Sequence, residues 1–264
     1  MNEPRIDSYS GTTSRRALLR LFGGASALAV GGCGKSAGYR YKLTLSLDTP
    51  QGIKTAYNVV EIYGSSISIP ASGVMQRAKG EALYLDTGAR PLIALLGRSS
   101  WSRSNPLPRN SDAQPQADRP TYLQWQWNNP TNFLWSLYAV DSHAQDDVDV
   151  ISIVSGLRGK RPLTTDELPD LVTFADVNDP KSVQRVDPNN LEATLGPGVK
   201  WRSMTIEVVS TWFTGLTSGI EDKLPWLRTM PEIMHLDGQS SGGGPGSSLA
   251  NSLQSSDFIH KHFY

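Results

Sequence analysis

The 264-residue sequence predicts a mainly β or α+β fold: an antiparallel sheet with short helical turns in a single globular domain. Three observations lead to this fold class. Apolar and polar residues alternate with a period of two in several segments, as half-buried strands require. Tight-turn residues separate those segments at short intervals. Helix-start signals occur, but a proline or glycine follows each of them closely, which allows only short helical turns.

The first two strands are expected to form a hairpin. Every second residue over 41–48 is apolar, and the turn Thr49-Pro50-Gln51-Gly52 follows. Its proline and glycine occupy the second and fourth turn positions, where they are favoured. A return strand over 53–63 completes the pair.

Two more strands are predicted at 76–86 and 92–96. The second is uniformly apolar, which indicates burial on both faces. Residues 98–120 are rich in serine, proline and asparagine and predict a long exposed loop. The aromatic-rich segment 122–140 is consistent with a core-facing strand or with a stacking platform for sugars.

The next elements are short. Residues 146–155 fit a helix or a strand equally well. Thr164 to Glu167 has the spacing of a capping box, and Pro169 ends that turn. Further elements are expected as a strand at 171–174, helical turns opened by Asp179-Pro180 and Asp187-Pro188, a strand at 199–210, and a helical turn within 219–227.

The sequence divides into four parts. Residues 1–32 predict a cleaved export signal, 33–38 a tether, 39–236 the β-rich globular domain, and 237–264 a flexible tail. The tail prediction depends on the Gly/Ser-rich stretch 238–248, which has the composition of a linker. The residues after this stretch, 249–264, are interpreted as a short docking segment at the end of the tail.

The stretch from Ala29 to Ser36 fits two incompatible patterns. As a phosphate loop it would need a strand before it and a helix after it, but a glycine-rich segment precedes it and a strand follows. As a lipobox, Val30-Gly31-Gly32-Cys33 would be cleaved before Cys33, which is the chain's one cysteine. The flanking residues favour the lipobox.

An export signal accounts for the residues that precede the lipobox. Arg15 and Arg16 in SRRALLR resemble a twin-arginine export motif, and a short apolar segment follows. That segment is shorter than the roughly 20 apolar residues that a transmembrane helix needs. Gly34 follows the cysteine where an aspartate would favour the inner membrane, so the inner leaflet of the outer membrane is the expected location.

No specific catalytic motif occurs, and no cofactor is predicted. An acidic cluster offers oxygen and imidazole ligands for a divalent metal, although a solvated acidic loop explains it more simply. Its candidate ligands are Asp141, His143, Asp146, Asp147 and Asp149. A second polar group, Asp176 to Asp179, is interpreted either as turn chemistry or as catalytic carboxylates.

Two blocks resemble a group of uncharacterised proteobacterial lipoprotein-like proteins with a twin-arginine-type signal and a lipobox. They are YRYKLTLSLDTPQGIKTAYNVVEI and DLVTFADVNDPKSVQRVDPNNLEATLGPGVKWRSMTIEV, the latter followed by TSGIEDKLPWL. The resemblance covers roughly residues 39–97 and 169–227. It implies no catalytic residues.

These features predict a membrane-anchored periplasmic lipoprotein that acts without catalysis. Its expected partners are the lipid bilayer, through acylated Cys33, and an envelope protein or glycan. Nucleic acid is not expected, because the chain has 25 basic and 25 acidic residues and the predicted signal removes more basic than acidic ones. The alternative is a hydrolase-like envelope enzyme that uses carboxylates in 141–149 or 176–179.

Overall fold

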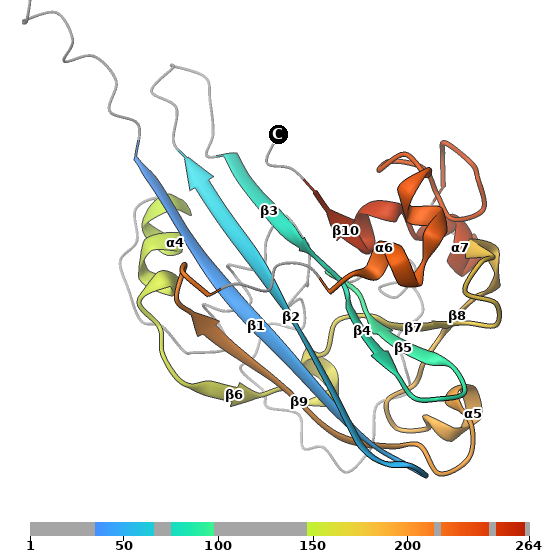
Figure 1. Cartoon of the computed structure of the whole chain (residues 1–264). Helices are drawn as coiled ribbons and strands as arrows, with labels where there is room; N and C mark the ends of the chain where they lie inside the picture. The colour runs from blue at the N-terminus through green and yellow to red at the C-terminus, as the bar shows by residue number, and fades with distance from the viewer. Residues whose placement is uncertain (1–34, 66–74, 98–146, 214–217, 243–246, 262–264) are drawn as a thin grey trace, which may run out of the picture.

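Two antiparallel sheets form the framework of the computed structural model (Figure 1), which describes residues 35–65, 75–97, 147–213, 218–242 and 247–261. In these residues the six-stranded sheet A has the order β10-β3-β2-β1-β9-β6, and the four-stranded sheet B has the order β4-β5-β7-β8. The strands are β1 (Ser36–Thr49), β2 (Gly52–Ser65), β3 (Met75–Glu81), β4 (Leu83–Asp86), β5 (Pro91–Ala94), β6 (Lys160–Pro162), β7 (Leu171–Phe174), β8 (Val183–Arg185), β9 (Lys200–Val209) and β10 (Ile259–His260).

Helical elements in the described residues are short. They are the helices α4 (Asp147–Ser155), α5 (Glu192–Leu195), α6 (Ile220–Lys223) and α7 (Leu249–Ser252), and the 3-10 turns η1 (Thr165–Glu167), η2 (Pro180–Ser182), η3 (Pro225–Arg228) and η4 (Ser255–Asp257). The predicted class, an antiparallel sheet with short helical turns in a single globular domain, is confirmed. The segment that fitted a helix or a strand equally well is the helix α4.

The predicted hairpin is the centre of sheet A. Strands β1 and β2 pair without a register shift from Ser36 opposite Ser65 to Thr49 opposite Gly52. Gly52 has φ of 107°, a conformation that glycine adopts without strain. Strand β1 begins earlier than its alternation suggested, so the tether predicted at 33–38 is too long: residues 36–38 already belong to the sheet.

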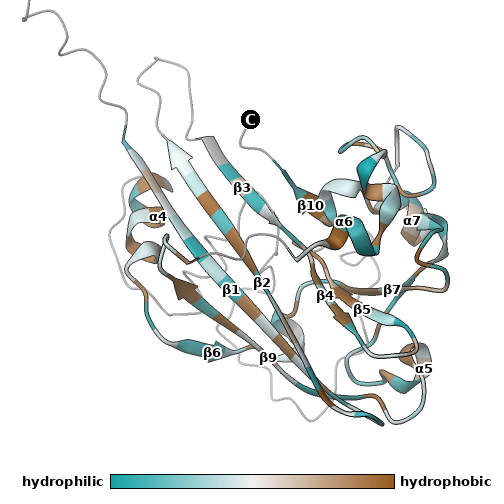
Figure 2. Ribbon diagram, viewed as in Figure 1, coloured by the Kyte–Doolittle hydropathy of each residue, from teal (hydrophilic) through white to brown (hydrophobic). Residues whose placement is uncertain are grey.

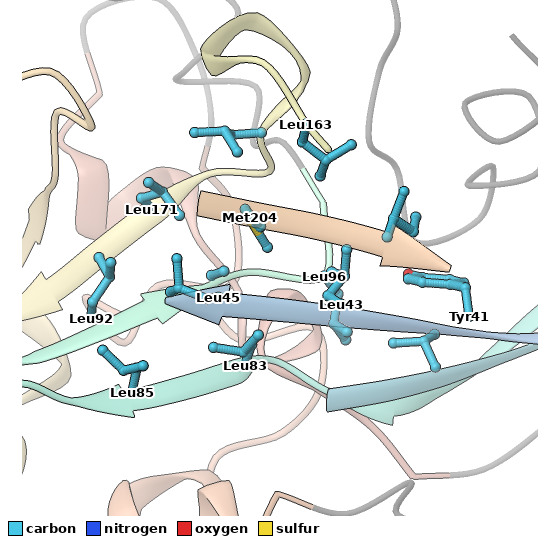
Figure 3. Close-up of a cluster of buried hydrophobic side chains, with 14 of the residues drawn as sticks. Tyr41, Leu43, Leu45, Leu83, Leu85, Leu92, Leu96, Leu163, Leu171 and Met204 are labelled. Carbon is cyan, nitrogen blue, oxygen red and sulfur yellow. The ribbon is translucent and has the colours of Figure 1, made fainter. Parts of the chain in front are cut away.

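The main core lies between the inner face of sheet A and one face of sheet B (Figure 3). The alternate side chains of β1, among them Leu43 and Leu45, meet Leu83 of β4 and Leu92 of β5. Helix α4 adds Ile151 to the same core and so covers part of the inner face of sheet A. Each such side chain stabilises the fold by about 1.5–3 kcal/mol when fully buried. Figure 2 shows the alternation of hydrophobic and hydrophilic residues along β2.

Sheet B is a middle layer, covered on both faces. Along β5 and just beyond it, Leu92 and Leu96 belong to the core shared with sheet A, whereas Ile93 and Leu95 belong to a second core. The uniformly apolar segment 92–96 is therefore buried on both faces, as predicted.

The second core is closed by the C-terminal part of the chain. Leu253, Phe258 and Ile259 are buried in it against sheet B. The prediction of a flexible tail at 237–264 is therefore wrong for residues 247–261, which form α7, η4 and β10. The linker-like stretch 238–248 precedes a docked segment, as the interpretation of the last residues expected, and this segment covers the second apolar face of sheet B.

Glu81 stands where the chain passes from sheet A to sheet B. The predicted strand 76–86 is divided here into β3 and β4. The Glu81 side chain is 6% exposed, and its Oε2 accepts hydrogen bonds from the Ser218 backbone N–H (2.6 Å), the Ser218 hydroxyl (2.9 Å) and the Ile220 backbone N–H (3.0 Å). Glu81 thus caps the first turn of α6 from a distant strand.

Backbone groups complete this junction. The Asn58 amide of β2 donates to the Glu81 carbonyl at 2.6 Å, and the Ala82 N–H donates to the Phe258 carbonyl at 2.7 Å. Two consecutive residues, Glu81 and Ala82, therefore join the strand break to strand β2, to helix α6 and to the C-terminal segment.

The chain that leaves β9 turns over the outer face of sheet A. Arg40 of β1 donates to the Phe213 carbonyl at 2.7 Å, and the Lys42 ammonium lies 5.3 Å from the centre of the Phe213 ring. The same chain reaches Glu81 at Ser218. The described residues at the two ends of the connection between β9 and α6 thus contact Arg40 and Glu81.

Replacing Glu81 by alanine should lower the free energy of unfolding by about 2–3 kcal/mol, because the buried Ile220 N–H loses a charged acceptor. Glu81→Gln keeps one acceptor oxygen and should cost about 1 kcal/mol. Urea unfolding measures both. Asp48→Ala removes an exposed ion pair with Arg202 and serves as the control, with a loss below about 1 kcal/mol. Equal losses in Glu81→Ala and Asp48→Ala would show that the cap carries no stability.

Replacing Phe258 by alanine should cost about 3–5 kcal/mol, because the side chain is fully buried between Phe174 and Trp226. Ser256→Ala, two residues earlier, is the matched control and should change stability by less than about 0.5 kcal/mol. Thermal or urea unfolding of the two variants checks this. An unchanged Phe258→Ala protein would mean that the C-terminal segment is not part of the folded core.

Candidate functional site

The predicted acidic metal cluster is largely outside the described residues. Asp141, His143 and Asp146 lie there, and Asp147 is described only as the first residue of α4. Asp149, on the same helix, forms an ion pair with Lys35 at 3.4 Å. Within the described ranges, no group of three or more histidine, cysteine, aspartate or glutamate side chains is arranged to hold a metal ion.

The second polar group is turn chemistry. Asp176 Oδ1 accepts the backbone N–H of Asn178 at 2.9 Å and its side-chain amide at 3.2 Å. Asp179 caps η2 by accepting the Lys181 N–H at 3.0 Å. The cap predicted for Asp179-Pro180 is confirmed, and these carboxylates satisfy local backbone groups.

Another predicted cap also forms. The Thr164 N–H donates to the Glu167 carboxylate at 2.9 Å, as the capping-box spacing predicts. Asp187 Oδ1 accepts the Asn189 N–H at 2.9 Å, but it closes a turn and caps no helix, because α5 begins only at Glu192 with Leu191 at its N-cap. The polar side chains that are most conspicuous in the sequence therefore accept hydrogen bonds from nearby backbone N–H groups.

The predicted export and lipidation residues, Arg15, Arg16 and Cys33, lie outside the described residues. The aromatic segment 122–140 and the loop 98–120 lie outside them as well. In the part of the chain that the structure describes, no helix combines the length and the apolar character that crossing a bilayer requires.

A groove of about 360 Å³ lies beside η3 and β10. It is lined by Leu227, Met230, Pro231, Glu232, Ile233, Ser255, Ile259 and Lys261. The Ser255 hydroxyl donates to the Pro231 carbonyl at 2.8 Å and so braces the wall of the groove. A groove of this size and lining suits a small apolar group. Of its charged residues, the Lys261 ammonium pairs with Glu221 at 2.6 Å.

Two titratable groups in the C-terminal segment, the partly buried Asp257 and the buried His260, escaped sequence-based prediction. Burial raises the pKa of Asp257 to about 7, and the negative charge of Asp170 adds to the rise, while a hydrogen bond from the Gln254 N–H opposes it. Burial lowers the pKa of His260 to about 4. Because a polar, Gly/Ser-rich context suggested a flexible tail, nothing in the sequence marked these side chains as buried.

Asp257 has a structural role. Its Oδ2 accepts the Gln254 N–H at 2.7 Å and so caps η4, and its backbone carbonyl accepts the Leu96 N–H at 2.9 Å. These contacts attach the C-terminal segment to the end of β5. The shifted pKa therefore reflects the docking of this segment onto sheet B.

Three large exposed hydrophobic side chains lie on the outer face of sheet A: Tyr63 near the beginning of β1, and Tyr57 and Ile53 nearer the β1–β2 turn. Trp212, in the turn after β9, is 90% exposed. Phe213, next to Trp212, lies over Lys42 of this face. These side chains are the described residues best placed to contact another surface.

Asp257 and His260 should change stability with pH in opposite directions. The raised pKa of Asp257 stabilises the folded chain below about pH 4, and this contribution is lost as the pH rises toward 7. The lowered pKa of His260 disfavours the folded chain at about pH 4, and this loss is recovered as the pH rises to 6.5. Between pH 4 and 6.5 the two effects oppose each other.

Single variants should separate the two effects. In Asp257→Asn, which keeps an oxygen to cap η4, the urea midpoint should rise from pH 4 to 6.5. In His260→Asn it should fall from pH 4 to 7. Midpoints measured at intervals of one pH unit check both slopes. Parallel profiles in the two variants and the wild type would contradict the assignment.

Comparison with known proteins gives no relative from which a function could be transferred. No family model, no curated protein and no solved structure matches the chain. Its function therefore has to be inferred from its own residues and geometry.

Proposed function

We propose that this protein is a lipoprotein of the bacterial cell envelope, held on the periplasmic side of a membrane by acylated Cys33 and acting without catalysis. The observation that carries the proposal is the position of the chain's one cysteine: it completes a lipobox, and the folded domain begins three residues later, at Ser36. A lipid-bound terminus followed at once by a folded domain fits an anchored protein.

Acylation accounts for these features chemically. Cleavage before Cys33 leaves this residue as the new N-terminus, and its thiol takes a diacylglycerol group through a thioether. Each buried CH₂ contributes about 0.8 kcal/mol, so two or three acyl chains hold the protein permanently. Gly34 favours the inner leaflet of the outer membrane.

The domain is suited to export in a folded state. The one cysteine of the chain is taken by the lipobox, so folding needs no intramolecular disulfide and no oxidising compartment. The two cores and the Glu81 junction close the fold by packing and hydrogen bonds alone. This supports the twin-arginine route, which carries folded proteins.

A binding role fits the described side chains better than catalysis does. The carboxylates of Asp176 and Asp179 accept local N–H groups, and in the groove beside η3 the Ser255 hydroxyl donates to the Pro231 carbonyl. The alternative, a hydrolase-like envelope enzyme, would use these carboxylates or the 141–149 cluster, most of which lies outside the described residues. The partner is proposed to be an envelope protein or a glycan.

Cys33→Ala should abolish incorporation of labelled fatty acid and release the protein from the membrane fraction. Arg15→Lys with Arg16→Lys should stop export and leave the unprocessed precursor in the cytoplasm. Arg20→Lys is the control, because lysine is common at that position of the export motif, and it should export normally. Fatty-acid labelling, immunoblotting for the processed form and cell fractionation measure these outcomes.

Membrane retention of unlabelled Cys33→Ala protein would contradict the anchor. Normal export of the paired lysine variant would contradict the twin-arginine route while leaving the anchor intact.

A further inference from the structure

We infer that the anchor-end patch, formed by Tyr63 and Arg77 on the outer face of sheet A and by Trp212 in the turn after β9, rests on the phospholipid surface of the membrane that holds Cys33. This inference rests on the proposed function, because it takes Cys33 as the point of attachment. It adds an orientation for the domain and a defined lipid-contacting surface.

The length of the tether limits the distance between the domain and the bilayer. Ser36, the first residue of β1, comes three residues after Cys33. A fully extended chain of that length spans about 10 Å. Acyl chains in the hydrocarbon keep Cys33 at the level of the lipid headgroups. The first residues of β1 must therefore lie within about 10 Å of the headgroups.

Strand pairing brings Tyr63 and Arg77 to this end of the sheet. Tyr63 of β2 is opposite Gly38 of β1 and also opposite Arg77 of β3. Directly paired side chains share one face of a sheet, so Tyr63 and Arg77 lie together. Gly38 is two residues into β1, about 7 Å along the strand from Ser36.

Trp212 reaches the same end from another strand. The turn that carries it is fixed by the hydrogen bond from Arg40 to the Phe213 carbonyl, and Arg40 is about 13 Å along β1 from Ser36. The Trp212 N–H donates to the Ser210 hydroxyl at 3.3 Å, which holds the turn. The side chain nevertheless remains 90% exposed.

The chemistry of the patch suits a lipid surface. Tryptophan and tyrosine prefer the membrane–water interface, where an apolar ring meets hydrocarbon and its polar group meets headgroups. A guanidinium such as that of Arg77 binds lipid phosphate. Lys35, whose side chain is 60% exposed, adds positive charge to the tether itself. Tyr63 lies on the outer face, so the inference turns this face toward the bilayer.

The rest of the outer face cannot make the same contact. Tyr57 is opposite Thr44, and Ile53 is opposite Asp48, eight and twelve residues into β1. These positions are about 27 and 40 Å from Ser36 along the strand. Tyr57 is more exposed than Tyr63 and lies on the same face, so it is a matched comparison at a greater distance from the anchor.

The test uses the full acylated protein in vesicles of phosphatidylethanolamine and phosphatidylglycerol. Trp212→Cys, Tyr63→Cys and the control Tyr57→Cys each provide one reactive thiol, because acylation blocks Cys33. An environment-sensitive fluorophore on each thiol is quenched by nitroxide-bearing lipids or by aqueous iodide. Labels at 212 and 63 should be quenched by the lipids at least threefold more strongly than the label at 57, which iodide should quench more strongly.

Equal lipid quenching at all three positions, or iodide quenching alone at 212 and 63, would overturn the inference. Protection of the label at 212 in intact envelopes but not in pure vesicles would also overturn it and point to a protein or glycan at the patch. Circular dichroism of each labelled protein confirms that it is folded.

Fatty-acid labelling of the same preparations separates the two proposals. A wild-type chain that takes up no fatty acid at Cys33 overturns the proposed function. A chain that is acylated and bound to vesicles, but whose labels at 212 and 63 stay in water, overturns the lipid contact alone.

Discussion

The structure depends on one buried carboxylate at the place where a strand changes sheets. Glu81 ends β3, and the chain then continues in sheet B as β4, so both sheets share this point. Its Oε2 accepts three hydrogen bonds from Ser218 and Ile220. A buried carboxylate is costly unless such donors replace water. Because these donors come from the residues at and before the start of α6, this helix is tied to the strand break.

Periodicity predicted the elements whose burial depends on local sequence. Strand β1 is buried on one face, and the alternation of apolar and polar residues along it predicts this. Strand β5 is buried on both faces, and its uniformly apolar sequence predicts this as well. The division at Ala82 follows no local signal, because the residues around it continue a strand pattern. It is set by partners far away in the chain: Phe258 accepts the Ala82 N–H, and Ser218 binds Glu81. Contacts between residues so far apart in the sequence cannot be predicted from the pattern of neighbouring residues.

The C-terminal segment shows the same limit. A strand that is apolar on both faces requires a covering layer on each face. The sequence of β5 predicts that both layers exist, but it does not show which segments of the chain form them. Composition assigned 237–264 to a flexible tail, yet Leu253 and Phe258 supply the second cover. For the same reason Asp257 and His260 could not be foreseen as titrating groups. The aspartates after β7 were visible in the sequence because caps and turns use adjacent residues, and the structure assigns them that role.

The way the proposed tether enters the fold determines how the domain can move on a membrane. Strand β1 is central in sheet A: β2 pairs with it from Ser36, and β9 pairs with it from Arg40. A force on Cys33 would therefore act directly on a strand that is hydrogen-bonded on both sides, with no loop to absorb it. The Lys35–Asp149 ion pair is exposed and adds little restraint. Orientation must then come from the short tether and from whichever residues of the anchor end meet the lipid. Under the proposed anchoring, the β1–β2 turn, at the opposite end of the longest strands, would be held away from the bilayer, and a partner would approach the domain from that end.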